Sequence, residues 1–177
     1  VKRWGQMLSC KGNVGSGYQF FVDKANRKAP QMYNDKGLKI KSSQLCSEIT
    51  LFSDSDNTFT CVLASENLRK YDERPEMLAF VGTVMLDCVA SDFIEKAKEK
   101  GNMECAVRFT EQSRALGYGV MALHTYLLDH SIVWGSLESK FTNIKMFSTI
   151  KSEATQATQW MAKVLGEPEI CRGYGVR

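Results

Sequence analysis

The sequence predicts a helix-rich α/β fold, on three observations. Long stretches after residue 75 carry apolar residues at spacings of three and four, which is the period of an amphipathic helix. Shorter stretches before residue 75 are rich in β-branched and apolar residues, as strands are. Two or three short strands make an incomplete sheet, whose unpaired edge strands could pair with other chains and aggregate. We therefore expect a single domain over residues 1–177 that is a segment of a larger α/β body.

Helix-breaking residues bound the helical stretches. Pro75, followed by an acidic residue, suits the first position of a helix, and Gly101 is expected to end that helix. A second helix is predicted over 113–129 and a third over 136–165, which Gly166 should stop. The expected buried face of the first of these helices consists of Leu78, Val81, Met85, Leu86, Val89 and Phe93.

The part before residue 75 is less regular. Its opening helix has apolar residues at helical spacing and is expected to break at Gly12, Gly15 and Gly17. Residues 45–52 and 58–63 are predicted to be strands, with a polar loop between them. They could form a hairpin, or each could pair with strands that the chain lacks.

Composition excludes several classes of function. The net charge of +3 comes from 23 basic and 20 acidic residues spread along the chain, without the basic stripe of a nucleic-acid-binding protein. No apolar run approaches the ~18 residues of a membrane helix. The first residues lack the apolar stretch of a secretory signal, so we expect a cytoplasmic protein.

The cysteines do not suggest a metal site or a disulfide framework. No two of them have the two-residue gap of a zinc knuckle or a thioredoxin-type site. A disulfide framework is disfavoured in a chain without an export signal. Cys88 lies in an apolar helical run and is expected to be a small buried hydrophobic residue. The six positions are Cys10, Cys46, Cys61, Cys88, Cys105 and Cys171.

Residues 42–49 place a thiol, Cys46, two positions before a carboxylate, Glu48. In an extended strand this spacing puts both side chains on one face. A neighbouring carboxylate raises the pKa of a thiol, so the thiol would be a poor thiolate nucleophile. The only histidines, His124 and His130, lie in the helix-rich half and leave a Cys/His hydrolase unsupported. The pair better suits a neutral thiol or sulfur radical beside a carboxylate that moves protons, and a buried strand cysteine is the plainer alternative.

The stretch Gln44-Leu45-Cys46-Ser47-Glu48 resembles the finger-loop motif Asn-Leu-Cys-x-Glu of class I and class II ribonucleotide reductase large subunits. The resemblance implies that the chain is a partial segment of the family's ten-stranded α/β barrel, through whose centre that loop runs. It implies that Cys46 carries the transient thiyl radical that takes the 3′ hydrogen of the substrate. Glu48 would be the base at the 3′ hydroxyl, and Ser43 and Gln44 would contact the substrate.

The stretch from Thr60 to Leu68 is similar to the family's Cys-x-Leu-x-Ser-x-Asn-Leu, whose cysteine is one half of the dithiol that reduces the substrate. By resemblance Cys61 takes that role. A reducing dithiol needs a second cysteine nearby. In the family this cysteine lies far upstream of the finger loop, and Cys10 is not at that position.

Three further stretches keep the family's order, at 17–26, 114–123 and 169–177, so the resemblance spans about residues 13–177. The middle stretch resembles a helix start. Its Arg114 is expected to hold backbone carbonyls or an acidic side chain, and its glycines to allow close helix packing. Two residues depart from the family: Gln44 replaces a near-fixed Asn that holds substrate hydroxyls, and Glu66 adds a charge.

The resemblance also implies what the chain needs from outside. No cofactor is expected in the chain itself. A radical-generating small subunit or a cobalamin would supply the radical, and an external dithiol would supply the electrons. The partners would be the other segments of the large subunit and a ribonucleoside diphosphate substrate, with no nucleic acid and no membrane. Two alternatives stay open: a diverged, non-catalytic binding or assembly module on the same scaffold, and a small thiol-redox protein that uses Cys46 and Cys61.

Overall fold

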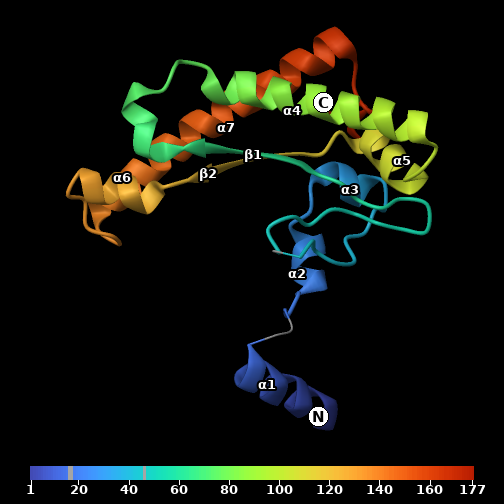
Figure 1. Ribbon diagram of the computed structural model, residues 1–177, viewed down its shortest axis with the longest axis horizontal. Coiled ribbons are helices and arrows are strands. Elements are labelled where there is room, and N and C mark those ends of the chain that lie inside the picture. The colour runs from blue at the N-terminus through green and yellow to red at the C-terminus, as the bar shows by residue number, and fades with distance from the viewer. Residues whose placement is uncertain (16–17, 46) are drawn as a thin grey trace. The chain divides into compact units, whose positions relative to one another are not determined.

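The computed structural model describes residues 1–15, 18–45 and 47–177 (Figure 1). It divides into two compact units, Val1–Ser53 and Asp54–Arg177. The helix-rich α/β fold is confirmed, because long helices accompany a small parallel sheet in the second unit. That the whole chain is one domain stays a prediction.

The first unit holds three helices, α1 (Lys2–Val14), α2 (Val22–Arg27) and α3 (Gln31–Asp35). Gly15 ends α1 in the left-handed conformation, with φ 67°, as expected for a glycine after a helix. Gly12 lies inside α1, so the expectation that it breaks the helix is wrong. A glycine in a helix interior costs about 1 kcal/mol relative to alanine but keeps its backbone hydrogen bond. Gly17 lies outside the described residues.

Asn26 organises the first unit around the backbone of Ile40. Its Nδ2 donates to the Ile40 carbonyl at 2.8 Å, and its Oδ1 accepts from the Ile40 amide at 2.9 Å. Ile40 forms an isolated antiparallel bridge with Phe52, whose ring packs edge-on against Tyr33. This bridge replaces the strand expected over 45–52, and no hairpin joins that segment to 58–63.

The sheet of the second unit consists of β1 (Val62–Asn67) and β2 (Leu116–Met121), which pair in parallel from Val62–Leu116 to Asn67–Met121. The strand expected at 58–63 therefore exists but begins at Val62. Within the described residues these two strands form the whole sheet.

The prediction of one continuous helix over 113–129 is wrong. The segment consists of the last residue of α5 (Glu104–Ser113), then β2, then α6 (Leu123–Asp129). Leu116 and Val120 fit both a period of two and a helical spacing, so the pattern was ambiguous. Pairing with β1 selects the strand, and the two intervening glycines, Gly117 and Gly119, lie in it and do not serve helix packing.

The two longest helices are α4 (Leu78–Lys100) and α7 (Leu137–Leu165), which pack against each other. Gly101 ends α4 as expected, and the bounds predicted for α7 are confirmed, with Ser136 Oγ accepting from the Ser139 amide. Pro75 does not start α4, because Met77 adopts φ 60° immediately before the helix begins. None of the helices in the described residues combines the length and the apolar character needed to cross a bilayer.

The buried face of α4 differs from the face expected. Val81, Met85 and Val89 are exposed, and so is Cys88, which was expected to be buried. Of the expected residues Leu86 is buried, and the other residues that α4 buries are Ala79, Thr83, Asp87, Ala90, Ile94 and Ala97. The three alanines among them allow the close approach of neighbouring elements, so packing outweighs bulk hydrophobicity in choosing the face.

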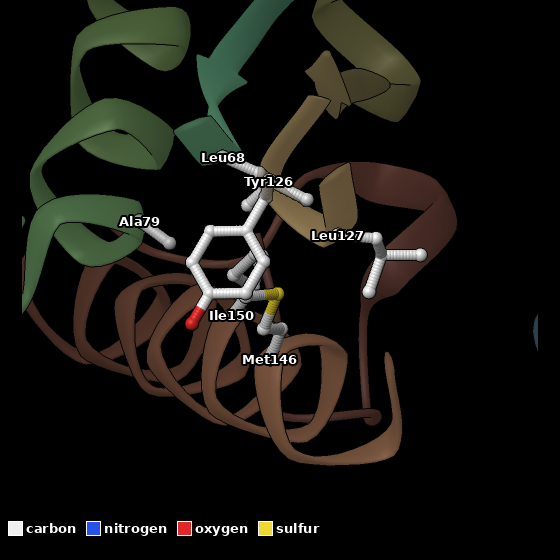
Figure 2. Close-up of a cluster of buried hydrophobic side chains, with 6 residues drawn as sticks. All are labelled: Leu68, Ala79, Tyr126, Leu127, Met146 and Ile150. Carbon is white, nitrogen blue, oxygen red and sulfur yellow. The ribbon is translucent and has the colours of Figure 1, made fainter. Parts of the chain in front are cut away.

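The main core of the second unit joins four elements (Figure 2). It gathers side chains from the 3₁₀ segment η1 (Leu68–Glu73), α4, α6 and α7. Its buried members are Leu68, Ala79, Tyr126, Leu127, Met146 and Ile150. Tyr118 and Val120 of β2 pack against this cluster, whereas Leu63 and Met121 are 55% and 53% exposed. In this unit the helices thus cover one face of the sheet, and the face with Leu63 is open.

Candidate functional site

In the first unit, Gln44 is hydrogen-bonded to Ile49 and Ser47 across a turn. The Gln44 amide donates to the Ile49 carbonyl at 3.2 Å, and the Ser47 amide donates to the Gln44 carbonyl at 3.1 Å. The Ile49 amide donates to Oε1 of the Gln44 side chain at 3.0 Å. Ser47 has φ 70°, a left-handed conformation that reverses the chain. Gln44, Leu45 and residues 47–49 therefore form a turn and not a strand.

This turn corrects one premise of the sequence argument. The extended backbone that would place Cys46 and Glu48 on one face is absent, because Ser47 between them is left-handed. Glu48 is exposed. Cys46 itself lies outside the described residues, so its role and its relation to Glu48 stay predictions.

The two polar atoms of the Gln44 side chain differ in their hydrogen bonding. Its Oε1 accepts from the Ile49 amide, while its Nε2 is buried and has no hydrogen-bond partner among the described residues. A buried polar group without a partner costs about 1–3 kcal/mol. An acceptor oxygen brought to this amide would remove that cost, so Nε2 is a candidate donor to a ligand. Ser43 next to it is half-buried.

Cys61 lies in the second unit, immediately before β1, and is half-buried. Its Sγ lies 3.8 Å from the Val62 carbonyl. The residue before it is anchored to α5, because the hydroxyls of Thr60 and Thr110 are hydrogen-bonded at 2.6 Å. The thiol is thus placed at the start of a strand whose exposed residues lie on the open face of the sheet.

Glu66, the second departure from the family motif, is a buried and fully paired carboxylate. Arg74 Nε donates to Glu66 Oε1 at 2.7 Å, and Nη1 and Nη2 of the same guanidinium donate to the two carboxylate oxygens of Glu153 at 3.0 and 2.8 Å. The Tyr118 hydroxyl donates to Glu66 Oε2 at 2.9 Å. The side chains of Arg74, Glu66 and Glu153 are 9%, 3% and 10% exposed.

The electrostatics of this cluster favour the charged carboxylate and guanidinium and the neutral phenol. The hydrogen bonds from Arg74 lower the pKa of Glu153, and the Ala79 amide, 3.0 Å from its Oε2, acts in the same direction. The bond to Glu153 raises the pKa of Arg74. Burial, followed by the bond to Glu66, raises the pKa of Tyr118. The cluster ties the end of β1 to α4 and α7.

The sequence argument missed Arg74 and Glu153. They lie 8 and 79 residues from their partners, at separations that belong to no local motif. The one available signal was the charge of Glu66, a departure from the family motif, which requires a counter-ion if it is buried.

The role expected for Arg114 is confirmed. Its Nη1 donates to the Asp87 carbonyl at 3.2 Å and to Ser91 Oγ at 2.6 Å, and lies 3.4 Å from Asp87 Oδ1. Arg177 adds an ion pair to Asp87 at 3.2 Å. The buried Asp87 of α4 is therefore held by two arginines. Among the described residues, no cluster of three or more His, Cys, Asp or Glu is placed to hold a metal ion.

Comparison with known proteins places this arrangement in a family. The family model described as ribonucleotide reductase, barrel domain, matches residues 2–174. The chain belongs to the ribonucleotide reductase barrel-domain family. This is a family of oxidoreductases. The sequence-based resemblance and the expected fold are thereby confirmed.

The relatives of this barrel-domain chain are large subunits. It is 40% identical over 177 residues to a Frog virus 3 (isolate Goorha) protein whose name assigns it to the ribonucleoside-diphosphate reductase large subunits, and covers 31% of it. It is 32% identical over 176 residues to the ribonucleoside-diphosphate reductase large subunit of Invertebrate iridescent virus 3, and covers 28% of it. In both alignments 98% of this chain is matched.

A solved structure supports the same assignment. The class Id ribonucleotide reductase alpha subunit of Actinobacillus ureae matches 99% of this chain with a TM-score of 0.93 and 40% identity. The match covers 34% of that subunit. The chain therefore spans about a third of the length of the large subunits that it resembles.

Proposed function

We propose that this chain is a segment, or a split-gene piece, of a ribonucleoside-diphosphate reductase large subunit and becomes catalytic when assembled with the remaining segments. The observation that supports the proposal is the turn in which Gln44 is hydrogen-bonded to Ile49 and Ser47, within the finger-loop motif of a chain of the reductase family. Leu45, Ser47 and Glu48 of this turn are exposed, as expected for a loop that meets a ligand and not for part of a packed core.

In this proposal Cys46 carries a thiyl radical that takes the 3′ hydrogen of the ribose and returns it at the end. Glu48 accepts the proton of the 3′ hydroxyl. Its carboxylate is exposed and therefore accessible to a substrate. The 2′ hydroxyl leaves as water. Cys61 and a second thiol from another segment supply two electrons and two hydrogens, and end as a disulfide.

Gln44 and Ser43 are proposed to hold the substrate. The buried Nε2 of Gln44 is a donor without a partner and would be satisfied by a ribose hydroxyl oxygen. Since Oε1 already accepts from the Ile49 amide, the side chain is held in place before the substrate arrives. A donor fixed in advance loses less entropy on binding than a mobile one.

The remaining requirements come from partners. The other segments of the large subunit supply the rest of the barrel, a radical-generating small subunit or a cobalamin supplies the radical, and an external dithiol regenerates Cys61. We place the protein in the cytoplasm, where reduced thiols persist.

Reconstitution tests the proposal. The chain is mixed with complementary large-subunit segments, small subunit, dithiol and a ribonucleoside diphosphate, and deoxynucleotide is measured. We expect product with the wild-type chain and none with Cys46→Ala or Cys61→Ala. Cys88→Ala is the matched control, since Cys88 is exposed on α4 and has no proposed role. Activity that survives Cys46→Ala would remove the radical assignment.

A non-catalytic assembly module is the second candidate, and one observation favours it. Gln44 commits its Oε1 to the loop itself, where the family's shorter Asn holds substrate. The second departure from the family motif, Glu66, does not favour it, because Arg74 neutralises the charge of Glu66. Binding to the complementary segments without any deoxynucleotide formation would support this second function over the first.

A further inference from the structure

Cys61 lies between two points at which the backbone is attached to other elements of the second unit. The pairing of β1 with β2 begins at Val62, one residue after Cys61. The residue before it, Thr60, is hydrogen-bonded through its hydroxyl to the hydroxyl of Thr110 on α5 at 2.6 Å, across 50 positions of sequence. The backbone on one side of the thiol is therefore held by the sheet, and the backbone on the other side is held by a helix.

The hydroxyl of Thr110 accepts this hydrogen bond. Its Oγ1 also lies 2.8 Å from the carbonyl oxygen of Ala106, one turn earlier in α5, and donates to it. A threonine hydroxyl carries a single proton. Since that proton is used at Ala106, the proton between the two threonines comes from Thr60. The two bonds form a chain from Thr60 through Thr110 to the backbone of α5.

Thr110 is a well-fixed point of attachment. It is 3% exposed, and the neighbouring Phe109 is fully buried, so α5 is packed against the rest of the second unit at this position. A second hydrogen bond, from the Thr58 amide to the Cys105 carbonyl at 3.3 Å, attaches the same segment to the same helix. The position of Thr60 therefore follows the position of α5.

The chemistry proposed for Cys61 requires a fixed backbone at this point. The S–H bonds of Cys61 and of the second thiol break, an S–S bond forms, and two electrons and two protons pass to the ribonucleotide. Two thiols close into a disulfide only where their Cα atoms lie about 4.4–6.8 Å apart. A displacement of about 1 Å is large against the ~0.5 Å tolerance of a productive site. Consecutive Cα atoms are only about 3.8 Å apart, so any freedom of Thr60 is passed directly to Cys61.

We propose that Thr110 is a positioning residue for the Cys61 thiol, because its hydroxyl holds the hydroxyl of the residue that precedes this thiol. Thr110 acts through Thr60 and takes no part in the chemistry. The inference rests on the role proposed above for Cys61 in reducing the substrate. In the assembled enzyme, loss of the bond should slow the closing of the disulfide. It should leave substrate binding, which is assigned to Ser43 and Gln44, unchanged.

Alkylation of the thiols tests the inference on the 177-residue chain. Iodoacetamide is added under native conditions, and mass spectrometry gives the rate at the half-buried Cys61 relative to the rate at the exposed Cys88 in the same sample. Thr110→Val removes the hydroxyl and keeps the branched shape of the side chain. Local opening at Cys61 then becomes more frequent, and we expect its relative rate to rise about three- to tenfold, as for the loss of one hydrogen bond. Thr110→Ser keeps the hydroxyl and should retain the wild-type rate.

Thr83→Val is the matched control. Thr83 is also 3% exposed, and its Oγ1 donates to the Ala79 carbonyl at 2.7 Å, so the substitution removes the same kind of bond from α4. It should leave the relative rate at Cys61 unchanged, even where urea unfolding shows a loss of stability equal to that of Thr110→Val. Thr60→Val removes the threonine pair from its half-buried end and should give the same rise in rate, which keeps the test decisive if Thr110→Val does not fold.

Three results of the alkylation experiment would overturn the inference. The first is a relative rate at Cys61 that neither Thr110→Val nor Thr60→Val raises. The second is an equal rise in Thr83→Val, which would show that general loss of stability exposes the thiol. The third is a Thr110→Ser chain that reacts as fast as Thr110→Val, because the hydroxyl would then have no part in the effect.

Turnover in the reconstituted reductase separates this inference from the proposed function. Thr110→Val should lower kcat by about three- to tenfold and leave KM for the ribonucleoside diphosphate unchanged, since positioning of the thiol affects a step after binding. If Cys61→Ala is inactive and Thr110→Val has the wild-type kcat, the positioning role falls and the proposed function stands. If Cys61→Ala is active, the role of Cys61 falls and the positioning role falls with it.

Discussion

The ring of Tyr118 lies directly against the backbone of Gly82, so that a Cβ built on Gly82 would lie 2.3 Å from Tyr118 Cε2. The absence of a side chain on α4 at this point lets the Tyr118 hydroxyl reach Glu66 at 2.9 Å. A glycine within a helix is usually a cost in stability. Here it allows a partly buried hydrogen bond between β2 and β1.

Gly82→Ala should therefore destabilise the protein. Alanine in a helix interior ordinarily adds about 0.5–1 kcal/mol of stability. The clash of the added methyl group with the Tyr118 ring outweighs this gain, and we expect the free energy of unfolding to decrease by about 1–3 kcal/mol. Urea unfolding followed by circular dichroism measures it. Gly12→Ala in α1, where nothing lies within 4 Å of the added methyl group, is the control and should not destabilise. An equal or higher stability for Gly82→Ala would contradict the packing.

Arg74→Met should be among the most damaging substitutions in the second unit. It leaves Glu66 and Glu153 buried without their counter-ion. Removing one partner of a buried ion pair costs about 3–5 kcal/mol. Unfolding curves measure the loss. Lys70→Ala, which breaks an exposed ion pair with Glu73, should cost less than about 1 kcal/mol and serves as the control. Similar losses for both variants would show that the buried pairing contributes little.

The lowered pKa of Glu153 predicts how stability depends on acid. A carboxyl group with a lower pKa in the folded state than in the unfolded chain contributes stability that is present above its unfolded value, 4.5. That contribution is lost as the pH falls from this value through the lowered pKa of the folded state. Melting temperatures measured from neutral pH downward should therefore decrease once the pH is lower than 4.5.

Glu153→Gln tests the assignment, because it removes the titrating group. The variant should be less stable at neutral pH but should lose less stability on acidification than the wild-type chain. If the variant and the wild type lose equal stability in acid, then other carboxyl groups cause the effect.

Gln44 is predicted to hold the 44–49 turn through its side chain. Gln44→Met removes the acceptor for the Ile49 amide and should increase hydrogen exchange at that amide. Gln44→Glu keeps an oxygen in the same place and should preserve protection at neutral pH. Nuclear magnetic resonance measures the hydrogen-exchange rate of the Ile49 amide directly. Leu45→Ala is the control, because Leu45 is 82% exposed. Unchanged exchange in Gln44→Met would contradict the side-chain bond.

The structure also explains which sequence-based expectations were wrong. The buried face of α4 was assigned to its bulky residues, yet Met85 and Val89 are exposed and Ala90 is buried. Hydrophobicity along one helix cannot reveal which face a neighbouring helix approaches. The strand β2 was assigned to a helix for a similar reason, since its partner Val62 lies 54 positions before Leu116 in the sequence.

The sequence by itself determined the family, through the finger-loop motif, and the ends of the helices at Gly101, Ser136 and Gly166. These features depend on local chemistry: the order of residues in a motif, and the backbone groups that each helix end leaves to be capped. Only the tertiary structure decided that Arg74 joins Glu66 to Glu153, that Gly82 makes room for Tyr118, and that Gln44 is hydrogen-bonded to Ile49 across a turn. Such contacts depend on which distant segments meet, because a buried charge or a close approach is satisfied by whatever the fold brings beside it.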